Sequence, residues 1–283
     1  MRISKLLFGL LTALSVMFFV ACSNDGGENG DIPLVNRISA KWEISDENSP
    51  YASFEFNKDG NYIVVMRNVE ANSRSLSVNS KNPFLKKPLK TRSSETNLSP
   101  IHFGTYKIEG NNIILSGFGV MEIINITAEE FSFSFTLEAT GEKNSFVAEK
   151  SAEPISSSSR TDMLCRSWLL NKVIIDFDSF SQEDIESYKE EYGENWKFEV
   201  ERNWSEDMLG LSVLFSRAGT YLVLYADGEA GLAEWKWANR EETKIYYSWD
   251  NWEYSGIAAI TELKPASLSV QEEHITWNFK IKQ

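Results

Sequence analysis

Aromatic side chains gather in two neighbouring segments near the end of the chain, and they are the residues best suited to holding a ligand. Rings that lie side by side on a sheet can stack on the C–H faces of sugars or on apolar chains, and Trp and Tyr add a polar tip. Only one of the nine Trp precedes residue 168, so this capacity is concentrated in the second half. The candidate ligand-binding residues are Trp235, Trp237, Tyr247, Trp249, Trp252 and Tyr254.

The second of these segments is typical of a β-hairpin. An Asp250–Asn251 turn suits a two-residue connection, because both residue types tolerate positive φ. That register sets Trp249 opposite Trp252. It also sets Tyr247 opposite Tyr254, and the alternation of side chains puts all four rings on one face. Exposed rings would form a platform for a ligand, whereas cross-strand packing alone would only stabilise the hairpin.

Residues that would support catalysis or bind a metal are sparse. The two histidines, His102 and His274, lie far apart, and neither stands beside a recognisable Ser or Cys nucleophile. The chain has no zinc-binding motif and no glycine-rich phosphate loop. Its formal net charge of −13 excludes simple electrostatic capture of nucleic acid, which needs a basic face. We therefore expect no catalytic residue, no metal site, no cofactor and no nucleic-acid partner.

The first 21 residues have the organisation of a secretory signal peptide. Arg2 and Lys5 precede the apolar run Leu6–Val20, which is shorter than the roughly 20 residues that a membrane-spanning helix needs. The run leads into Ala21 and Cys22, and this junction resembles the cleavage and acylation site of bacterial lipoproteins. The resemblance implies cleavage before Cys22 and lipidation of its thiol and amine. An ordinary secretory signal followed by an incidental cysteine is the alternative.

Residues 22–36 are polar, acidic and rich in glycine, so they are predicted to form a flexible tether. A calcium-binding EF-hand loop is excluded, because Gly27 and Asn36 stand where carboxylate ligands are needed. The tether resembles the export segment of surface lipoproteins in Bacteroidetes-type bacteria, which implies a lipid-anchored protein on the outer face of the outer membrane. If Cys22 carries lipid, Cys165 has no disulfide partner, and we expect it to be a small buried apolar residue.

A serine-rich linker over residues 151–161 divides the mature chain into two domains, 37–150 and 162–283. In each domain, short alternating apolar runs separated by turn residues predict eight antiparallel strands. In the first domain they are expected near 40–45, 51–57, 61–69, 102–108, 112–117, 119–126, 131–138 and 143–149. In the second they are expected near 166–176, 211–216, 219–226, 230–238, 243–249, 252–262, 266–270 and 274–281.

The two domains also match in sequence. Residues 53–65 align with 212–224 without a gap, and residues 126–133 parallel 263–270. Each domain opens with a Trp in its first predicted strand. These matches indicate a tandem duplication. The two Trp are Trp42 and Trp168, and the identical pairs of the first alignment are Ser53/Ser212, Phe56/Phe215, Gly60/Gly219, Tyr62/Tyr221 and Val64/Val223.

A first-strand Trp, an F-x-x-x-G-x-Y hairpin and a late I/L-x-x-x-x-L/F turn resemble the lipocalin-like domain of Bacteroidetes lipoproteins. The resemblance covers about 37–150 and 162–283, and it implies a barrel that can hold a cavity, but no reaction. Eight sequential strands remove their exposed edges by closing into an up-and-down barrel, and a two-sheet sandwich is the alternative. The predicted fold class is all-β, with two tandem eight-stranded up-and-down antiparallel barrels and one short helix inserted in the second.

The first of two insertions covers residues 71–98. It is polar, lacks a strand pattern, and carries six basic residues against the single acid Glu95. A solvated loop is one interpretation, and a lid or docking arm for an anionic ligand or surface is the other.

The second insertion, 177–210, is predicted to contain a helix that begins after Ser181 and ends at Gly193. We expect this helix to lie across an end or flank of the barrel and to plug it, or alternatively to gate a cavity. The residues on its apolar face are Ile185, Tyr188 and Tyr192.

The sequence leaves three functional hypotheses. The first is a non-catalytic surface lipoprotein that binds a glycan or a small apolar ligand through the aromatic hairpin or the barrel cavity of the second domain. The second is a structural lipoprotein that docks on a larger outer-membrane protein assembly. The third is a glycan-active enzyme, since 41 acidic residues leave a catalytic carboxylate pair open. We expect the first, because the aromatic residues gather in one domain of a chain without catalytic motifs.

Overall fold

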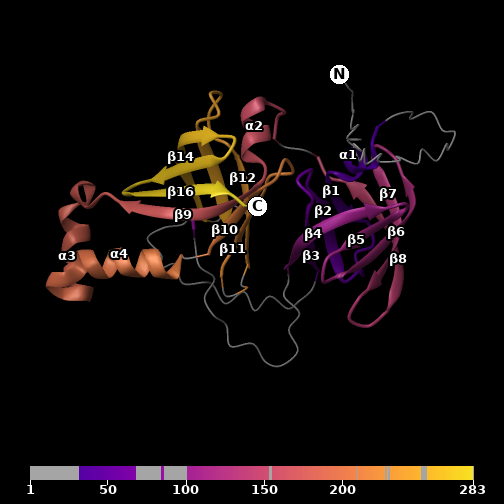
Figure 1. Cartoon of the computed structure of the whole chain (residues 1–283), viewed down its shortest axis with the longest axis horizontal. Coiled ribbons are helices and arrows are strands. Elements are labelled where there is room, and N and C mark those ends of the chain that lie inside the picture. The colour runs from indigo at the N-terminus through magenta and orange to yellow at the C-terminus, as the bar shows by residue number, and fades with distance from the viewer. Residues whose placement is uncertain are drawn as a thin grey trace, which may run out of the picture. The chain divides into compact units, whose positions relative to one another are not determined.

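The computed structural model describes residues 32–67, 84–85, 101–152, 155–208, 210–226, 228, 230–249 and 254–282. Within these residues, sixteen strands form two closed antiparallel barrels of eight strands each (Figure 1). In both barrels each strand pairs with the next along the chain, and the last strand returns to the first. The predicted signal peptide, Cys22 and most of the predicted tether lie outside the described residues.

The first barrel follows a short helix, α1 (Leu34–Ile38), and has all eight predicted strands. Its strands are β1 (Lys41–Ile44), β2 (Tyr51–Phe56), β3 (Asn61–Met66), β4 (Ile101–Glu109), β5 (Asn112–Leu115), β6 (Gly119–Ile126), β7 (Glu130–Leu137) and β8 (Lys143–Lys150). The pairing of β1 with β8 closes the sheet, with Glu43 opposite Glu149.

The second barrel follows helix α2 (Ser159–Leu164) and also has its eight predicted strands. They are β9 (Ser167–Ile175), β10 (Ser212–Phe215), β11 (Thr220–Leu224), β12 (Ala230–Trp237), β13 (Lys244–Trp249), β14 (Tyr254–Lys264), β15 (Ser267–Glu272) and β16 (Ile275–Ile281). Because β9 pairs with both β10 and β16, the sheet is continuous around the barrel. Closure of both sheets excludes the two-sheet sandwich.

Aromatic rings fill the interior of the first barrel. Phe54 on β2 lies edge-on to Phe133 and Phe135 of β7, with ring centroids 5.4 and 5.6 Å away. Phe118, in the turn between β5 and β6, packs on Phe135 at 5.3 Å and stacks on Tyr62 of β3 at 6.4 Å. All these rings come from the strands and turns of the barrel itself, so the first barrel builds this part of its core from its own residues.

In both barrels, the Trp of the first strand makes the same hydrogen bond to the short helix that precedes the barrel. Trp42 lies in the first strand of the first barrel, and its indole Nε1 donates to the carbonyl oxygen of Ile38, 2.8 Å away at the end of α1. Trp168 donates in the same way to Leu164 at the end of α2, at 3.0 Å. Both Trp are fully buried. The shared contact supports the tandem duplication inferred from the sequence.

The insertion between β9 and β10 holds two helices where one was predicted. Helix α3 (Gln182–Tyr192) is the predicted one, because the Ser181 Oγ accepts from the Asp184 N–H and Gly193 ends the helix at a φ of 71°. Helix α4 (Trp196–Asp207) was not predicted. Two short 3-10 turns complete the insertion, η1 (Phe177–Ser179) and η2 (Gly193–Asn195).

The two inserted helices form a core of their own. Tyr188 of α3 and Trp196 and Val200 of α4 make a separate buried cluster, and Ile175 at the end of β9 packs against it. Figure 1 shows both helices beside that end of β9. In the described part of the chain, the buried core of the second barrel includes no residue of α3 or α4, so neither helix enters the barrel interior. The reason is that α3 turns its aromatic face toward α4. The insertion does lie against one end of the barrel, as predicted, where Ile175 packs against both cores.

Candidate ligand site in the second barrel

Three of the candidate aromatic residues belong to the buried core of the second barrel. Trp235 on β12, and Tyr247 and Trp249 on β13, have exposed fractions of 1, 0 and 5%. Trp237 is half-buried, and its Nε1 donates to the Oγ1 of Thr161 in α2 at 2.9 Å. Trp235 is paired with Tyr247, so these side chains lie on one side of the sheet. The described part of the aromatic hairpin therefore lines the barrel interior and does not form a surface platform.

The predicted turn of the aromatic hairpin is wrong. Trp249 pairs with Tyr254, so four residues join the strands, not Asp250–Asn251 alone. Tyr247 consequently pairs with Gly256. A Cβ at position 256 would lie 2.0 Å from the hydroxyl oxygen of Tyr247. The observed register therefore places Gly256, which has no side chain, against the ring of Tyr247.

Two further candidates belong to the tip of this hairpin. Trp252 lies outside the described residues, and Tyr254 begins β14 with a side chain that also lies outside them. The basic segment 71–98 lies outside them too, except for Phe84 and Leu85. These two residues occupy the centre of the candidate site.

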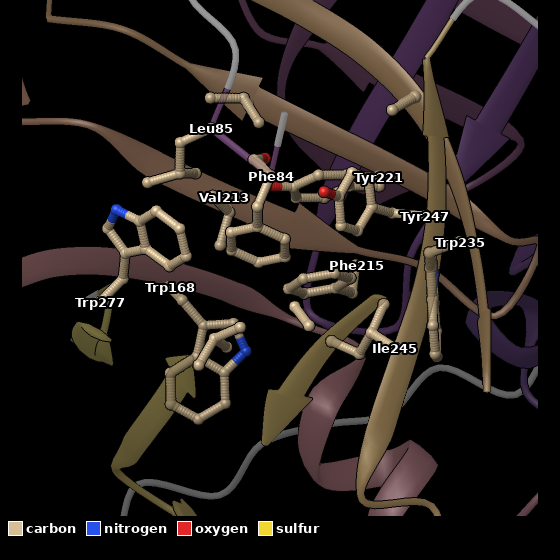
Figure 2. Packing of buried hydrophobic residues seen from close by; sticks show 14 of the residues in the cluster. Phe84, Leu85, Trp168, Val213, Phe215, Tyr221, Trp235, Ile245, Tyr247 and Trp277 are labelled. Atoms are coloured by element: carbon tan, nitrogen blue, oxygen red, sulfur yellow. The ribbon is translucent and has the colours of Figure 1, made fainter. Parts of the chain in front are cut away.

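Phe84 and Leu85 belong to the connection between β3 and β4 of the first barrel, yet they are buried in the core of the second (Figure 2). Their exposed fractions are 0 and 1%. The Phe84 ring stacks on Tyr221 of β11 at 5.3 Å and meets Tyr247 edge-on at 5.5 Å. Trp277 of β16 contacts the same ring at 5.1 Å. Three aromatic side chains of the barrel thus form a slot for one phenyl ring.

The backbone of Phe84 is held as well as its ring. The Tyr221 hydroxyl donates to the Phe84 carbonyl oxygen at 2.6 Å, and the Phe84 N–H donates to Oε2 of Glu272 at 3.4 Å. The other oxygen of this carboxyl accepts from the Tyr247 hydroxyl. A buried polar group without a partner costs about 1–3 kcal/mol, so these contacts allow the segment to enter the core.

Glu272 is an ionisable group within this aromatic interior. It ends β15 with an exposed fraction of 8%, and burial raises the pKa of its carboxyl to about 7, against the opposing effect of its hydrogen bonds from Tyr247 and Phe84. Burial, and then the neighbouring Glu272, raise the pKa of the Tyr247 hydroxyl. The phenol therefore stays protonated and remains a donor, while the carboxyl changes its charge near neutral pH.

Three interior phenylalanines of the first barrel have smaller or polar counterparts in the second. The repeat alignment sets two valines against two of them, and its continuation by two residues sets a glutamate against the third. The pairing of β7 with β8 and of β15 with β16 agrees with this. Replacing Phe by Val removes ring volume from a close-packed core. Trp277, which stands against Phe146, restores part of this volume, and Phe84 occupies the remaining space. The three pairs are Phe54/Val213, Phe133/Val270 and Phe135/Glu272.

The equivalent tyrosines of the two barrels have partners of different origin. In the first barrel Tyr62 stacks on Phe118, and its hydroxyl donates to the carbonyl of Ser116 at 3.0 Å. In the second barrel Tyr221 stacks on Phe84 and donates to the Phe84 carbonyl. Ser116 and Phe118 belong to the first barrel's own β5–β6 connection, whereas Phe84 comes from outside the second barrel. Among the described residues, the second barrel is thus completed by a segment from outside its own strands and turns.

Phe84, Leu85 and Glu272 were not predicted from the sequence. One signal was present, because Phe84 is the only aromatic residue over positions 67–100, a stretch rich in polar and basic residues. Glu272 falls two residues beyond the predicted end of its strand, so its inward direction was not recognised. The burial of a glutamate beside a tyrosine on another strand has no local sequence signature.

A separate hollow of about 270 Å³ is bounded in part by Glu55, Cys165 and Arg217. Arg217 pairs with Asp162, and the buried Glu55 accepts from the Oγ1 of Thr220 at 2.6 Å. Burial raises the pKa of the Cys165 thiol, which keeps it protonated and a poor nucleophile. Over the described ranges, no group of three or more His, Cys, Asp or Glu is placed to hold a metal ion. The interior of the second barrel is the stronger candidate site.

Neither a scan against protein-family models nor a search of curated proteins found a match to this chain. No helix in the described part of the chain is both long enough and apolar enough to cross a membrane. The chain is therefore classed by its fold, as a tandem pair of closed eight-stranded up-and-down barrels.

Proposed function

We propose that this chain is a non-catalytic ligand-binding protein whose second barrel holds a small apolar or aromatic ligand in its interior. The observation that carries the proposal is the complete burial of Phe84, a side chain that no strand of the second barrel supplies. A barrel whose own side chains leave room for a phenyl ring can admit another group of that size.

The walls around Phe84 have the composition of a small-molecule site. Such sites are mostly apolar and aromatic, and a few placed polar groups fix the orientation of the ligand. Tyr221, Tyr247 and Trp277 supply the rings, and Glu272 with the two tyrosine hydroxyls supplies the polar groups. A ligand that combines a ring with one donor and one acceptor would satisfy all of them.

The burial of the described aromatic rings on β12 and β13 favours an apolar ligand over a glycan. Trp235, Tyr247 and Trp249 belong to the barrel core, where they offer no open surface for a sugar to stack on. A sugar would also bring many hydroxyl groups into a space with few polar partners, and each unpaired hydroxyl is costly.

In the same proposal, a lipid on Cys22 carries the barrels on the outer face of the outer membrane. The charged start, the short apolar run and the cysteine at its end support this anchor. The polar residues 22–36 support a tether between the lipid and the first barrel. In this proposal, the chain attaches to the membrane by its lipid and binds the ligand in its second barrel.

To test ligand binding, the native occupant is removed and a probe of similar size is offered. The double variant Phe84→Ala/Leu85→Ala loses about 3–5 kcal/mol of stability for the phenyl ring, and it opens the slot. The apolar fluorophore 1-aminonaphthalene is then titrated into the folded whole chain. We expect saturable binding that is at least about tenfold tighter than binding to the wild type, because the competing side chains are gone.

Two variants make this titration specific to the second barrel. Phe118→Ala removes the equivalent ring from the first barrel, and it should bind the fluorophore no better than the wild type. Val213→Phe, added to the double variant, gives the second barrel the phenylalanine that the first barrel has at the equivalent position. It should abolish the increase in affinity for the fluorophore. If the folded double variant binds no more tightly than Phe118→Ala, ligand binding in this barrel is refuted, and docking on a larger outer-membrane assembly becomes the better account.

A further inference from the structure

We infer that the ligand of the second barrel is a peptide segment in which a phenylalanine is followed by an aliphatic residue. Phe84–Leu85 is the chain's own copy of that segment, and it occupies the site in the structure (Figure 2). The inference rests on the proposed function and specifies its ligand class.

The second barrel provides an acceptor for a peptide N–H that the first barrel lacks. Glu272 accepts from the Phe84 N–H through Oε2, at 3.4 Å. Phe135 stands at the equivalent place in the first barrel and offers no acceptor. The hydrogen bond to a backbone carbonyl, in contrast, occurs in both barrels, because Tyr62 of the first barrel donates to the carbonyl of Ser116. Recognition of both backbone groups of one residue is therefore particular to the second barrel.

The position of Glu272 makes a donor on the ligand important. A carboxyl among aromatic rings is unfavourable unless its oxygens are hydrogen-bonded. The Tyr247 hydroxyl satisfies one oxygen, and the Phe84 N–H satisfies the other. A purely apolar ligand would fill the slot but leave Oε2 without this partner, so an amide-bearing ligand should bind more tightly.

Two side-chain positions complete the recognition of a dipeptide. The first is the aromatic slot, where Tyr221, Tyr247 and Trp277 contact the Phe84 ring. The second holds Leu85, which is buried in the same core. Extended peptides are commonly recognised in this way, with main-chain hydrogen bonds for affinity and pockets for side-chain specificity.

The covalently attached copy competes with any free peptide. A tethered segment acts at an effective concentration on the order of millimolar, so a free peptide must displace it to bind the wild-type chain. Removal of the Phe84 and Leu85 side chains relieves this competition. The affinity for a free peptide should therefore rise in the double variant that opens the slot.

Isothermal titration calorimetry of acetyl-Phe-Leu-amide tests the inference. In the whole chain carrying Phe84→Ala/Leu85→Ala, we expect one-to-one binding at least about tenfold tighter than in the wild type. Acetyl-Ala-Leu-amide, which lacks the ring, should not bind. Phe118→Ala serves as the matched control, and its affinity for acetyl-Phe-Leu-amide should equal that of the wild type.

The role of Glu272 is tested by removing the donor from the peptide. Acetyl-(N-methyl)Phe-Leu-amide keeps the ring but has no N–H at that residue, and we expect about tenfold weaker binding. In the same background, Glu272→Leu removes the acceptor, so methylation should no longer change the affinity. If methylation weakens binding equally with and without the carboxyl, Glu272 does not recognise the N–H and the inference fails.

The two probes separate failure of this inference from failure of the proposed function. Binding of 1-aminonaphthalene without binding of acetyl-Phe-Leu-amide refutes a peptide ligand and leaves an apolar one. Binding of neither to the folded double variant refutes both. If the double variant does not fold, the thermal midpoint of the wild-type chain is measured with and without the peptides. Millimolar acetyl-Phe-Leu-amide must then raise its thermal midpoint and acetyl-Ala-Leu-amide must not, and an unchanged midpoint overturns the inference.

Discussion

Glu272 makes the interior of the second barrel sensitive to pH. Burial raises the pKa of its carboxyl from an ordinary 4.5 to about 7, because desolvation outweighs the hydrogen bonds from Tyr247 and Phe84. The neighbouring Glu273 acts in the same direction as burial. Between these two pH values, the native state keeps a proton that the unfolded chain has lost.

We predict that Glu272→Gln removes a pH-dependent loss of stability. Since the folded-state pKa is raised, the free energy of unfolding of the wild type falls as pH rises from 4.5 to about 7, and it is level above that. The shift corresponds to about 3 kcal/mol. Glutamine keeps an acceptor for the Tyr247 hydroxyl and does not titrate, so the variant should not show this loss. Urea unfolding at several pH values between 4 and 8 measures it.

Glu234→Gln is the matched control for this measurement. Glu234 lies on β12 of the same barrel, and its side chain is exposed. Its replacement should not remove the loss of stability that Glu272→Gln removes. A Glu272→Gln curve that runs parallel to the wild-type curve would show that the buried carboxyl does not titrate in this range.

At the scale of the elements, the strands of both barrels accommodate large rings by placing glycines against them. Gly256 on β14 is paired with Tyr247, and Gly119 on β6 lies where a Cβ would be 2.7 Å from the ring of Phe135. Gly231 on β12 has the indole of Trp249 at 3.0 Å from the same hypothetical position. Strand register inside these barrels is therefore coupled to the position of glycine.

Gly256→Ala should destabilise the second barrel by about 1–3 kcal/mol, the usual effect of overpacking a core. The new Cβ would lie 2.0 Å from the Tyr247 hydroxyl oxygen and 2.9 Å from a carboxyl oxygen of Glu272, so the contact between these two side chains must be disturbed. Urea unfolding followed by Trp fluorescence gives the change. Ile257→Ala, at the next residue with a side chain that is 55% exposed, should change stability by less than about 0.5 kcal/mol. Equal effects of the two substitutions would contradict the packing account.

Elements that follow from local pattern were predictable, and contacts between distant residues were not. The alternation of Phe131, Phe133 and Phe135 with serines predicts β7 directly, and Ser181 marks the start of α3. Helix α4 was missed because half of its residues are charged, which hides the apolar spacing of Trp196 and Val200. The strand register of the aromatic hairpin depends on the contact of Gly256 with Tyr247, and turn propensity contains no information on that contact.

The central contact of the candidate site is the clearest case of a feature beyond local pattern. The hydrogen bond between Tyr221 and Phe84 joins residues 137 positions apart. The repeat alignment contained half of the information, since Val213, Val270 and Glu272 leave less ring volume than their counterparts in the first barrel. It could not show which segment fills the space, because that depends on where the β3–β4 connection passes in the folded chain.

At the scale of the whole molecule, the two barrels differ in where the rings of their cores come from. The first barrel fills the place beside its Tyr62 with its own Phe118, whereas the second uses Phe84 from the first half of the chain. In the proposed function, this arrangement would couple ligand binding in the second barrel to a segment of the first.

The proposed membrane anchor concerns the whole molecule, and substitutions of the two cysteines test it. We predict that Cys22→Ser prevents acylation and moves the protein from the membrane fraction to the soluble fraction of a Gram-negative host. The physical reason is that each buried CH₂ group of an acyl chain contributes about 0.8 kcal/mol to membrane affinity, so loss of the lipid removes most of the attachment. Cys165→Ser is the matched control, because this thiol is largely buried in the second domain, so the substitution should leave membrane attachment and the mass added by acylation unchanged. Intact mass spectrometry reports acylation, and membrane fractionation reports attachment. A Cys22→Ser chain that stays in the membrane fraction would exclude the lipid as the anchor, and resistance of the wild type to protease added to intact cells would exclude the outer face.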